Sequence, residues 1–250
     1  MVKKRKKFQG VLNILSFNRH FYVIGLLVLV VLIAALNFFK IPPVITGIIL
    51  GVFLYGFLMP LLVSAYVYDF SGYYHFAWLE ELGLKKENPQ QIVNINAGFD
   101  ETSFILENHF PKTNIQVFDF YNAKEHTEPA IVRARKVSLV YPNTQQIQTN
   151  HIPLEDNSVA IVFLLSAVHE IRSHAEKVLF LKECKRICAP NGKIITVEHL
   201  RDIPNFLAFS IGFTHFFSRN IWKKAFKEAG FATFKETKFT PFMSIFLCSS

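Results

Sequence analysis

The fold of this chain is decided by residues 158–200, SVAIVFLLSAVHEIRSHAEKVLFLKECKRICAPNGKIITVEHL. Residues 158–168 and 192–200 are short runs dominated by apolar residues, which is typical of strands buried on both faces of a sheet. Between them, residues 174–187 place apolar side chains at helical spacing. A strand, a helix and a strand in this order predict a βαβ unit, in which the two strands are parallel.

The same alternation continues on both sides of this unit. We predict strands at 91–98, 114–121 and 145–149, helices at 102–110 and 123–138, and then a helix at 219–231 followed by strands at 232–240 and 241–250. Repeated strand–helix units that end in two strands predict an α/β fold, a doubly wound, mostly parallel, Rossmann-like sheet of seven strands with a C-terminal antiparallel hairpin. In such a sheet the ligand binds beyond the carboxyl ends of the strands.

Two long apolar segments precede this domain. Residues 21–39 contain no charged residue over 19 positions, and residues 44–65 contain none over 22. Each is long enough to cross a hydrocarbon core of about 30 Å as a helix. The pair Pro42-Pro43 separates them, so the sequence predicts a transmembrane helical hairpin. A cleaved signal peptide is the alternative for the first segment, but its apolar run exceeds the usual ~7 to 15 residues.

The charge is distributed unevenly along the chain. Residues 1–68 carry seven basic side chains and no acidic one, which leaves 20 basic and 19 acidic residues for 69–250. The basic start predicts an amino terminus on the cytoplasmic side, and two crossings return the chain to that side. The near-neutral remainder argues against a nucleic-acid partner, because phosphate binding requires a dense cationic face.

These patterns predict four parts of the chain: a basic cytoplasmic tail at 1–20, the transmembrane hairpin at 21–66, a juxtamembrane linker at 67–90 and the α/β domain at 91–250. The predicted location is the cell membrane, with two helices crossing it and the domain on the cytoplasmic side. Membrane lipids are therefore expected partners, and the sequence does not indicate the oligomeric state.

Two aromatic-rich segments allow two interpretations each. Tyr73, Tyr74, Phe76 and Trp78 in the linker either lie at the lipid headgroups or pack onto the domain. The phenylalanines of residues 203–218 recur at roughly helical spacing. They form either ordinary core or an apolar surface over the edge of the active site, which serves as a lid for a lipophilic acceptor or dips into the membrane interface.

The cysteines do not predict a metal site. Cys184, Cys188 and Cys248 form no CxxC pair, and neither an HExxH motif nor a Cys/His cluster is present in the sequence. We therefore expect reduced thiols and no bound metal.

The domain resembles a known enzyme family. The stretches that carry the resemblance are, in order, INAGFDETS (95–103), IQVFDF (115–120), IPLEDNSVAIVFLLSAVHEI (152–171), ICAPNGKIITVEH (187–199) and EAGF (228–231). Together they resemble the class I S-adenosylmethionine-dependent methyltransferases, in particular those that act on small molecules, quinones or lipids. The resemblance implies S-adenosylmethionine as the cofactor and methyl transfer as the activity.

The glycine-rich turn departs from the family pattern. Where the family has an acid and three glycines at alternate positions, this chain has Asn94, Asn96, Gly98 and Asp100. Gly98 allows the close approach of a cofactor, and Asn96 tolerates the left-handed backbone of a tight turn. Asp100 either caps the next helix or contacts the amino group of the methionine moiety.

Two further residues complete the predicted cofactor site. Asp119 ends the second strand, where a carboxylate can accept hydrogen bonds from the ribose hydroxyls, as in dinucleotide sites. The resemblance places the adenine on residues 148–151, with Thr149 among its contacts.

The candidate catalytic residues are His169, Glu198 and His199. His169 follows the strand at 158–168, and Glu198 and His199 end the strand at 192–200, so all three are expected at the carboxyl edge of the sheet. Either histidine can take a proton near neutral pH if the acceptor must lose one.

The sequence therefore predicts a membrane-anchored methyltransferase for a small, lipophilic acceptor. The alternative is a non-catalytic, membrane-tethered domain of methyltransferase fold, which the altered glycine turn makes plausible. A nucleotide-dependent oxidoreductase is less consistent with the sequence, because GxGxxG is absent after the first strand.

Overall fold

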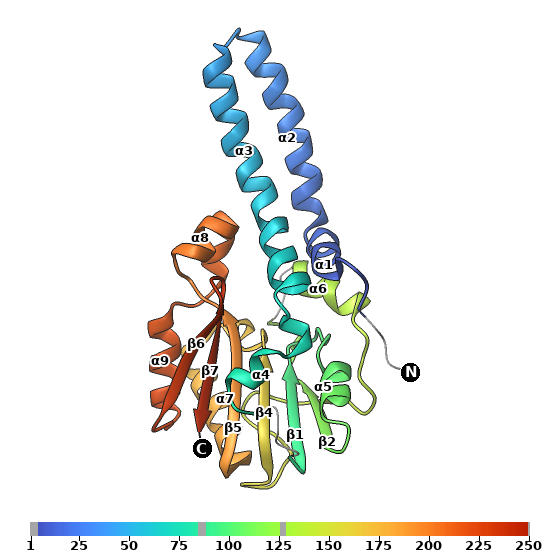
Figure 1. Ribbon diagram of the computed structural model, residues 1–250, viewed down its shortest axis with the longest axis vertical. Coiled ribbons are helices and arrows are strands. Elements are labelled where there is room, and N and C mark those ends of the chain that lie inside the picture. Colours follow the sequence, from blue (N-terminus) through green and yellow to red (C-terminus); the bar gives the residue numbers. More distant parts are fainter. Residues whose placement is uncertain (1–4, 85–88, 126–128, 250) are drawn as a thin grey trace.

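The computed structural model describes residues 5–84, 89–125 and 129–249 and consists of a helical hairpin standing on an α/β domain (Figure 1). The hairpin is formed by α2 (Arg19–Phe38) and α3 (Pro43–Ser64). Pro43 occupies the first turn of α3, where a missing N–H costs nothing. Both helices are long and apolar enough to cross a membrane, and most of their surface is exposed.

A single sheet of seven strands forms the centre of the domain. The strands are β1 (Gln91–Asn96), β2 (Asn114–Asp119), β3 (Gln145–Gln146), β4 (Val159–Leu165), β5 (Cys188–His199), β6 (Phe234–Thr240) and β7 (Met243–Ser249). Their order is β3-β2-β1-β4-β5-β7-β6, and only the contacts of β7 are antiparallel. The predicted fold class is confirmed, including the C-terminal antiparallel hairpin of β6 and β7.

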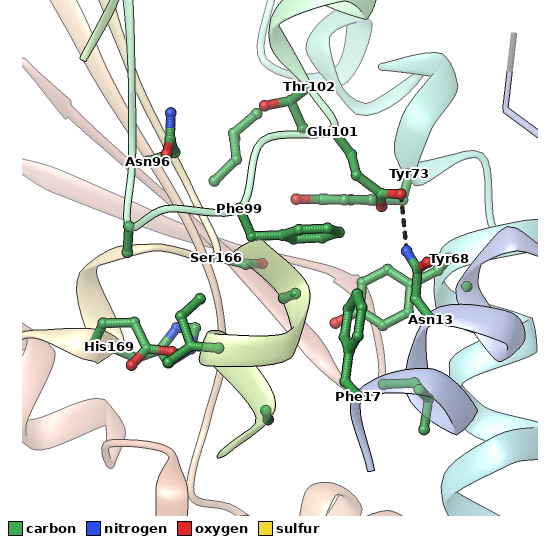
Figure 2. A pocket seen from close by; sticks show the side chains of 18 of the residues that line it. Asn13, Phe17, Tyr68, Tyr73, Asn96, Phe99, Glu101, Thr102, Ser166 and His169 are labelled. Carbon is green, nitrogen blue, oxygen red and sulfur yellow. Dashed lines mark hydrogen bonds and ion pairs between the residues drawn. The ribbon is translucent and has the colours of Figure 1, made fainter. Parts of the chain in front are cut away.

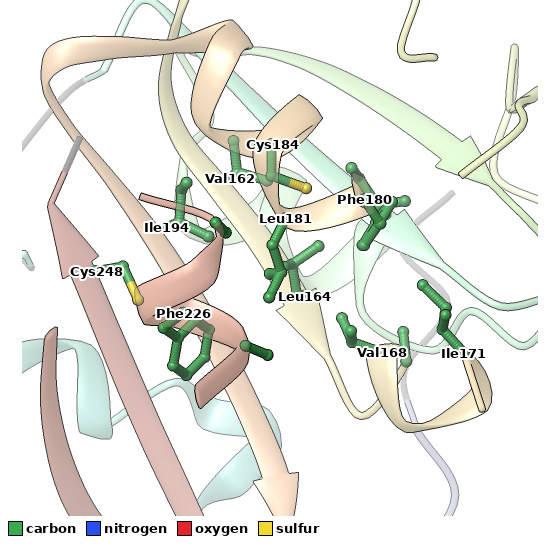
Figure 3. Close-up of a cluster of buried hydrophobic side chains, with 14 of the residues drawn as sticks. Val162, Leu164, Val168, Ile171, Phe180, Leu181, Cys184, Ile194, Phe226 and Cys248 are labelled. Carbon is green, nitrogen blue, oxygen red and sulfur yellow. The ribbon is translucent and has the colours of Figure 1, made fainter. Parts of the chain in front are cut away.

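Two apolar cores lie on the two faces of this sheet. One core includes α7 (His174–Ile187) and α9 (Arg219–Glu228), and Figure 3 shows its centre, where Phe180 and Leu181 of α7 lie near Leu164 of β4. Cys184, Cys188 and Cys248 are buried in it and form no disulfide with one another.

The second core is covered by shorter segments. These are the π-helical turn η1 (Ala65–Phe70), the 3₁₀ turn η2 (Tyr73–His75), α4 (Trp78–Glu81), α5 (Ser103–His109) and α8 (Ile203–Phe209). Tyr73, Phe76 and Trp78 are all buried here. The aromatic residues that follow the hairpin therefore pack onto the domain, which is one of the two interpretations that the sequence allowed.

The amino-terminal segment contains a helix that the sequence interpretation did not include. Within residues 1–20, expected to be a basic tail, α1 covers Gln9–Phe17. The carboxylate of Asp69 accepts hydrogen bonds from the backbone amides of Gly10 and Val11 at 2.9 and 3.3 Å, which satisfies free N–H groups in the first turn of α1. The start of the chain is thereby attached to the segment that follows α3.

The predicted element boundaries differ from the structure in several places, most of all in the helix at 123–138 and the strands at 145–149 and 192–200. The last of these is β5, which already begins at Cys188. The helix expected at 123–138 is α6 (Pro129–Val137), and residues 126–128 lie outside the described part of the chain. The strand expected at 145–149 has only two residues, Gln145 and Gln146.

Candidate active site

A cavity of about 220 Å³ lies at the carboxyl ends of β1 and β4, between which the strand order reverses. Asn94, Asn96 and Ala97 line it from the end of β1, and Leu165 and Ser166 line it from the end of β4. A doubly wound sheet binds its ligand at this position.

The opposite wall comes largely from segments that precede the predicted domain at 91–250. It is formed by α1, η1 and η2, which contribute Ile14, Phe17, Tyr68, Tyr73 and Tyr74, and by α6, which contributes Ala130, Ile131 and Ala134. Figure 2 shows Phe17 of α1 facing Phe99, and the two rings meet edge to face with centroids 5.2 Å apart. The segments that flank the apolar hairpin thus close the cavity with aromatic and aliphatic side chains.

Glu101 holds this wall in place. Its carboxylate accepts hydrogen bonds from Arg5 Nη1 at 2.6 Å, from Asn13 Nδ2 at 2.8 Å and from the Tyr74 hydroxyl at 2.6 Å (Figure 2 shows the bond from Asn13). One side chain after β1 therefore connects the start of the chain, α1 and η2.

The turn after β1 is tight, as the position of Gly98 predicted. Gly98 has a φ of +92°, a left-handed conformation that residues with a Cβ rarely adopt. Asn96 stabilises the turn from both sides, because its Oδ1 accepts a bond from the Gly98 amide at 2.9 Å and its Nδ2 donates to the Phe118 carbonyl at 3.2 Å.

Asn94 and Asp100 both stabilise the start of α5. Asp100 Oδ1 accepts hydrogen bonds from the backbone amides of Thr102 and Ser103, each at 2.9 Å. Asn94 Nδ2 donates to the hydroxyls of the same two residues at 3.0 and 2.8 Å. Of the two roles weighed for Asp100, the structure shows the helix cap.

Asp119 is paired with an arginine of this chain. Arg135 Nη1 of α6 lies 2.7 Å from Asp119 Oδ2, and Asp119 Oδ1 accepts the Tyr121 amide at 2.8 Å. The guanidinium also covers the Tyr121 ring, 4.1 Å from its centroid. A Cβ at position 98 would collide with Arg135, so this side chain fills the space beside the glycine turn.

In the described part of the chain, the predicted site residues that line the cavity are Asn94, Asn96 and His169, whereas Gly98, Asp100, Asp119, Thr149, Glu198 and His199 do not line it. The Thr149 hydroxyl instead donates to Glu176 Oε1 of α7 at 2.8 Å. The Phe-rich segment 203–218 forms α8 and the 3₁₀ turn η4 (Ser210–His215), and α8 packs beside α3. No described residue of this segment is among those that line the cavity, whose outer wall includes α1 and α6.

His169 and Glu198 form a buried pair at the cavity wall. His169 belongs to the 3₁₀ turn η3 (Val168–Glu170), and its Nδ1 lies 2.6 Å from Glu198 Oε2. Its backbone amide donates to the other Glu198 oxygen at 3.2 Å. Burial lowers the pKa of His169, but the negative charges of Glu198 and Glu170 outweigh this effect and raise it to about 10. The two carboxylates thus favour positive charge at this place.

His199 lies apart from this pair and has a different environment. Its Nε2 is 2.8 Å from the Tyr68 hydroxyl, and its Nδ1 is 2.9 Å from the Phe242 carbonyl and 3.1 Å from Asn205 Oδ1. Burial lowers the pKa of His199 to about 4. Both ring nitrogens are thus engaged in the interior, and His199 does not line the cavity in the described residues. Its position indicates a structural role.

The sequence did not identify Phe17, Glu101 and Arg135 as residues of the site. The apolar spacing within residues 11–17 is a signal for α1, but the basic residues before it favoured a tail. Nothing in the sequence indicates that Arg135, on a basic helix, pairs with Asp119.

Comparisons with known proteins find similarity to methyltransferases. Residues 109–196 match the family model described as a methyltransferase domain. A curated relative, a highly reducing polyketide synthase from Pyrenophora dematioidea, is 34% identical over 92 residues, and the match covers 31% of this chain but 4% of that protein.

Two solved structures are similar to this chain. Human N-acetylserotonin methyltransferase in complex with S-adenosylmethionine is 15% identical, with a TM-score of 0.51 over 86% of this chain and 61% of that one. An S-adenosylmethionine-dependent methyltransferase from Aquifex aeolicus is 18% identical, with a TM-score of 0.49 over 71% of this chain and 92% of that one. The chain has a methyltransferase fold. Together with the family match, this supports S-adenosylmethionine as the cofactor and methyl transfer as the activity.

The residues at the edge of the methyltransferase sheet fit this cofactor. Asn96 and Asp119 are paired in register on β1 and β2, so the glycine turn and the carboxylate lie side by side, as a ribose requires. Arg135 fills this space, and the cofactor would have to replace its guanidinium on Asp119.

Proposed function

We propose that this protein is a membrane-anchored methyltransferase that transfers a methyl group from S-adenosylmethionine to a small lipophilic acceptor, with its catalytic domain on the cytoplasmic side. The observation that carries the proposal is the composition of the cavity wall. Its outer side consists of α1, which precedes the apolar hairpin, and of η1 and η2, which follow it.

The exposed surface of the hairpin supports the anchor. Phe21, Leu27, Val30 and Val52 are 52–70% exposed on α2 and α3, in helices that carry no acidic residue. Exposed apolar faces of this length are stable in a lipid bilayer rather than in water. The basic residues of positions 3–7 precede the first helix, which supports a cytoplasmic amino terminus.

The lining of the cavity supports a lipophilic acceptor. Ile14, Phe17 and Phe99 present apolar surface to it, and apolar ligands gain about 25 cal/mol per Å² of surface removed from water. Because α1 and η1 flank the hairpin, an acceptor that leaves the bilayer would meet this surface close to the membrane.

Different residues of this chain would bind the cofactor, position the acceptor and exclude water. When bound, S-adenosylmethionine supplies an electrophilic methyl group on a positively charged sulfur. Gly98 and Asp119 would hold its ribose end. His169, oriented by Glu198, would position the acceptor oxygen at the cavity wall, and the enclosing aromatic residues would exclude water.

A second candidate function is a non-catalytic domain that is tethered to the membrane and has a methyltransferase fold. The Asp119–Arg135 ion pair favours it, because that pair occupies the space a cofactor requires. Titration calorimetry of the full chain in detergent with S-adenosylmethionine separates the two candidates, since only the methyltransferase binds the cofactor.

The activity itself is tested by incubating the full chain with methyl-labelled cofactor and a membrane lipid extract. We expect label in the organic phase. His169→Ala should reduce this transfer by about 10²-fold or more. His174→Ala, which removes an exposed histidine paired with Glu228, should have no effect. Equal transfer by both variants would exclude the role of His169, and transfer only to water-soluble acceptors would exclude the lipophilic substrate.

A further inference from the structure

Three metal-binding side chains converge beside the cavity. The ligand atoms of His169, Glu170 and His215 all lie within 4.8 Å of one another. Glu170 Oε1 is 3.5 Å from His169 Nε2 and 3.9 Å from His215 Nε2. His169 and Glu170 line the cavity.

Arg172 ties together the two backbone segments that carry these residues. His169 and Glu170 lie on η3, whereas His215 ends η4, more than forty positions along the chain. Arg172 Nη1 donates to the His169 carbonyl at 3.1 Å and to the His215 carbonyl at 2.7 Å. A single guanidinium thus fixes the spacing of the segments, so the cluster does not depend on the chance approach of flexible side chains.

Glu198 fixes the orientation of His169. Its carboxylate, with only 1% of the side chain exposed, binds both Nδ1 and the backbone amide of His169. The Nε2 atom is therefore directed toward Glu170. Histidines that bind metals typically donate their other ring N–H to a carboxylate in this way, which fixes the tautomer and increases the basicity of the ligand atom.

We propose that His169, Glu170 and His215 bind one divalent metal ion of the zinc class, with an open coordination position toward the cavity. Two imidazoles and one carboxylate form the donor set of open zinc sites. Ligands about 2.0–2.2 Å from a tetrahedral zinc ion lie about 3.4 Å from one another. His169 and Glu170 already have this spacing at 3.5 Å, whereas His215 lies 3.9 Å from Glu170 and must move closer. His215, on a half-buried turn, can supply this movement by rotation of its side chain.

The metal site would restrict the methyl acceptor to a narrower chemical class. This extension rests on the proposed methyl transfer. A metal ion with an open position binds an oxygen of the acceptor and lowers the pKa of its hydroxyl group. The favoured acceptor is therefore a lipophilic molecule with a hydroxyl group. Its proton would pass to solvent, and the oxygen would then form its bond to the methyl carbon as the bond between that carbon and the cofactor sulfur breaks, which leaves S-adenosylhomocysteine.

Metal binding is tested without reference to activity. The full chain, purified in detergent without a histidine tag and treated with a chelator, is titrated with Zn²⁺ alone. We expect one ion per chain, a loss of affinity of about 10–100-fold for Glu198→Gln, and a larger loss for His215→Ala. His174→Ala serves as the matched control, because it removes a histidine outside the cluster.

Co²⁺ provides a second measurement. The d–d spectrum should indicate nitrogen and oxygen ligands, whereas a thiolate-to-cobalt charge-transfer band would assign the ion to a cysteine and overturn the proposal. No binding by the parent chain, or equal binding by His215→Ala and His174→Ala, would also overturn it. Thermal unfolding of chelated His215→Ala checks its fold, and Glu170→Gln should weaken binding as an independent variant.

The outcomes distinguish this inference from the proposed function. Methyl transfer that proceeds fully after chelation, in a chain that binds no zinc, supports the function and refutes the metal site. Zinc binding that requires His215, in a chain without methyl transfer, supports the metal site and refutes the function.

Discussion

Asp119 and Arg135 form an ion pair at the position that we propose for the cofactor ribose. Arg135→Ala should strengthen binding of S-adenosylmethionine, because the guanidinium no longer competes for the carboxylate. Asp119→Ala should weaken it by about 1.5 to 3 kcal/mol, the value of hydrogen bonds to a charged group. Calorimetry on both variants checks this. Binding that is unchanged by Asp119→Ala would refute the assignment of the ribose site.

Lys177 makes stability depend on pH. It is buried on α7 with its Nζ 3.0 Å from the centroid of the Phe217 ring. Burial lowers its pKa from 10.5 to about 7, while Glu198 opposes the shift and Arg172 adds to it. Between pH 7 and 10.5 the folded chain therefore binds fewer protons at Lys177 than the unfolded chain, and its contribution to stability increases with pH.

We expect Lys177→Met to remove this dependence and to raise Tm at pH 7, by about 2–4 °C for each kcal/mol gained. Thermal unfolding of both proteins from pH 6 to pH 9 is the measurement. Parallel Tm curves for the two proteins would show that Lys177 is not the titrating group.

At the residue scale, the sequence predicted where side chains lie in the sheet better than it predicted which residues they contact. His169, Glu198 and His199 all lie at the carboxyl edge of the sheet, as their places after buried strands required. Their environments differ because the contacts of each come from distant segments: His169 meets Glu198, but His199 meets Tyr68. Such long-range pairing leaves no trace in local spacing.

Among the elements, α8 is the one whose role changes most with the structure. Its exposed apolar residues, together with one in η4, are Ile203, Phe206, Leu207 and Ile211. The Tyr55 hydroxyl of α3 donates to the Leu207 carbonyl at 2.9 Å, so this surface lies beside the apolar hairpin. We expect it to enter the membrane interface, since each large apolar side chain gains about 1.5–3 kcal/mol there.

A polarity-sensitive fluorophore is attached to the cysteine of Ile211→Cys, and the protein is placed in nanodiscs that contain brominated lipid. Contact with this lipid should quench its fluorescence. The same fluorophore on Lys235→Cys, exposed on β6, should not be quenched. Equal quenching at both positions would contradict the contact of this surface with lipid.

The elements of the sheet could be predicted from sequence because a buried strand or an amphipathic helix carries its own periodicity. The helix predicted at 174–187 coincides with α7. In contrast, α1 and η1 have boundaries that depend on a partner. Asp69 caps α1 from another part of the chain, and the apolar run of the hairpin continues into η1 without a local stop signal.

At the scale of the whole molecule, the proposed transmembrane hairpin determines which side of the membrane each part of the chain faces. Lys40, in the turn between α2 and α3, should lie outside the cell, and Lys235 of β6 should lie inside. A membrane-impermeant thiol reagent should label Lys40→Cys in intact cells, whereas Lys235→Cys should react only after lysis. The native cysteines are buried and give little background. The reverse pattern would refute the proposed orientation.

The continuity of α3 with η1 determines how the protein meets its substrate. The helix passes directly into η1, where Tyr68 binds His199 at the end of β5, so no flexible tether separates the hairpin from the sheet. With the hairpin in a bilayer, the cavity stays at a constant height above the lipid. Under the proposed function, encounters with the acceptor would then become a two-dimensional search by lateral diffusion, and turnover would follow the surface density of the acceptor rather than its total concentration in the cell.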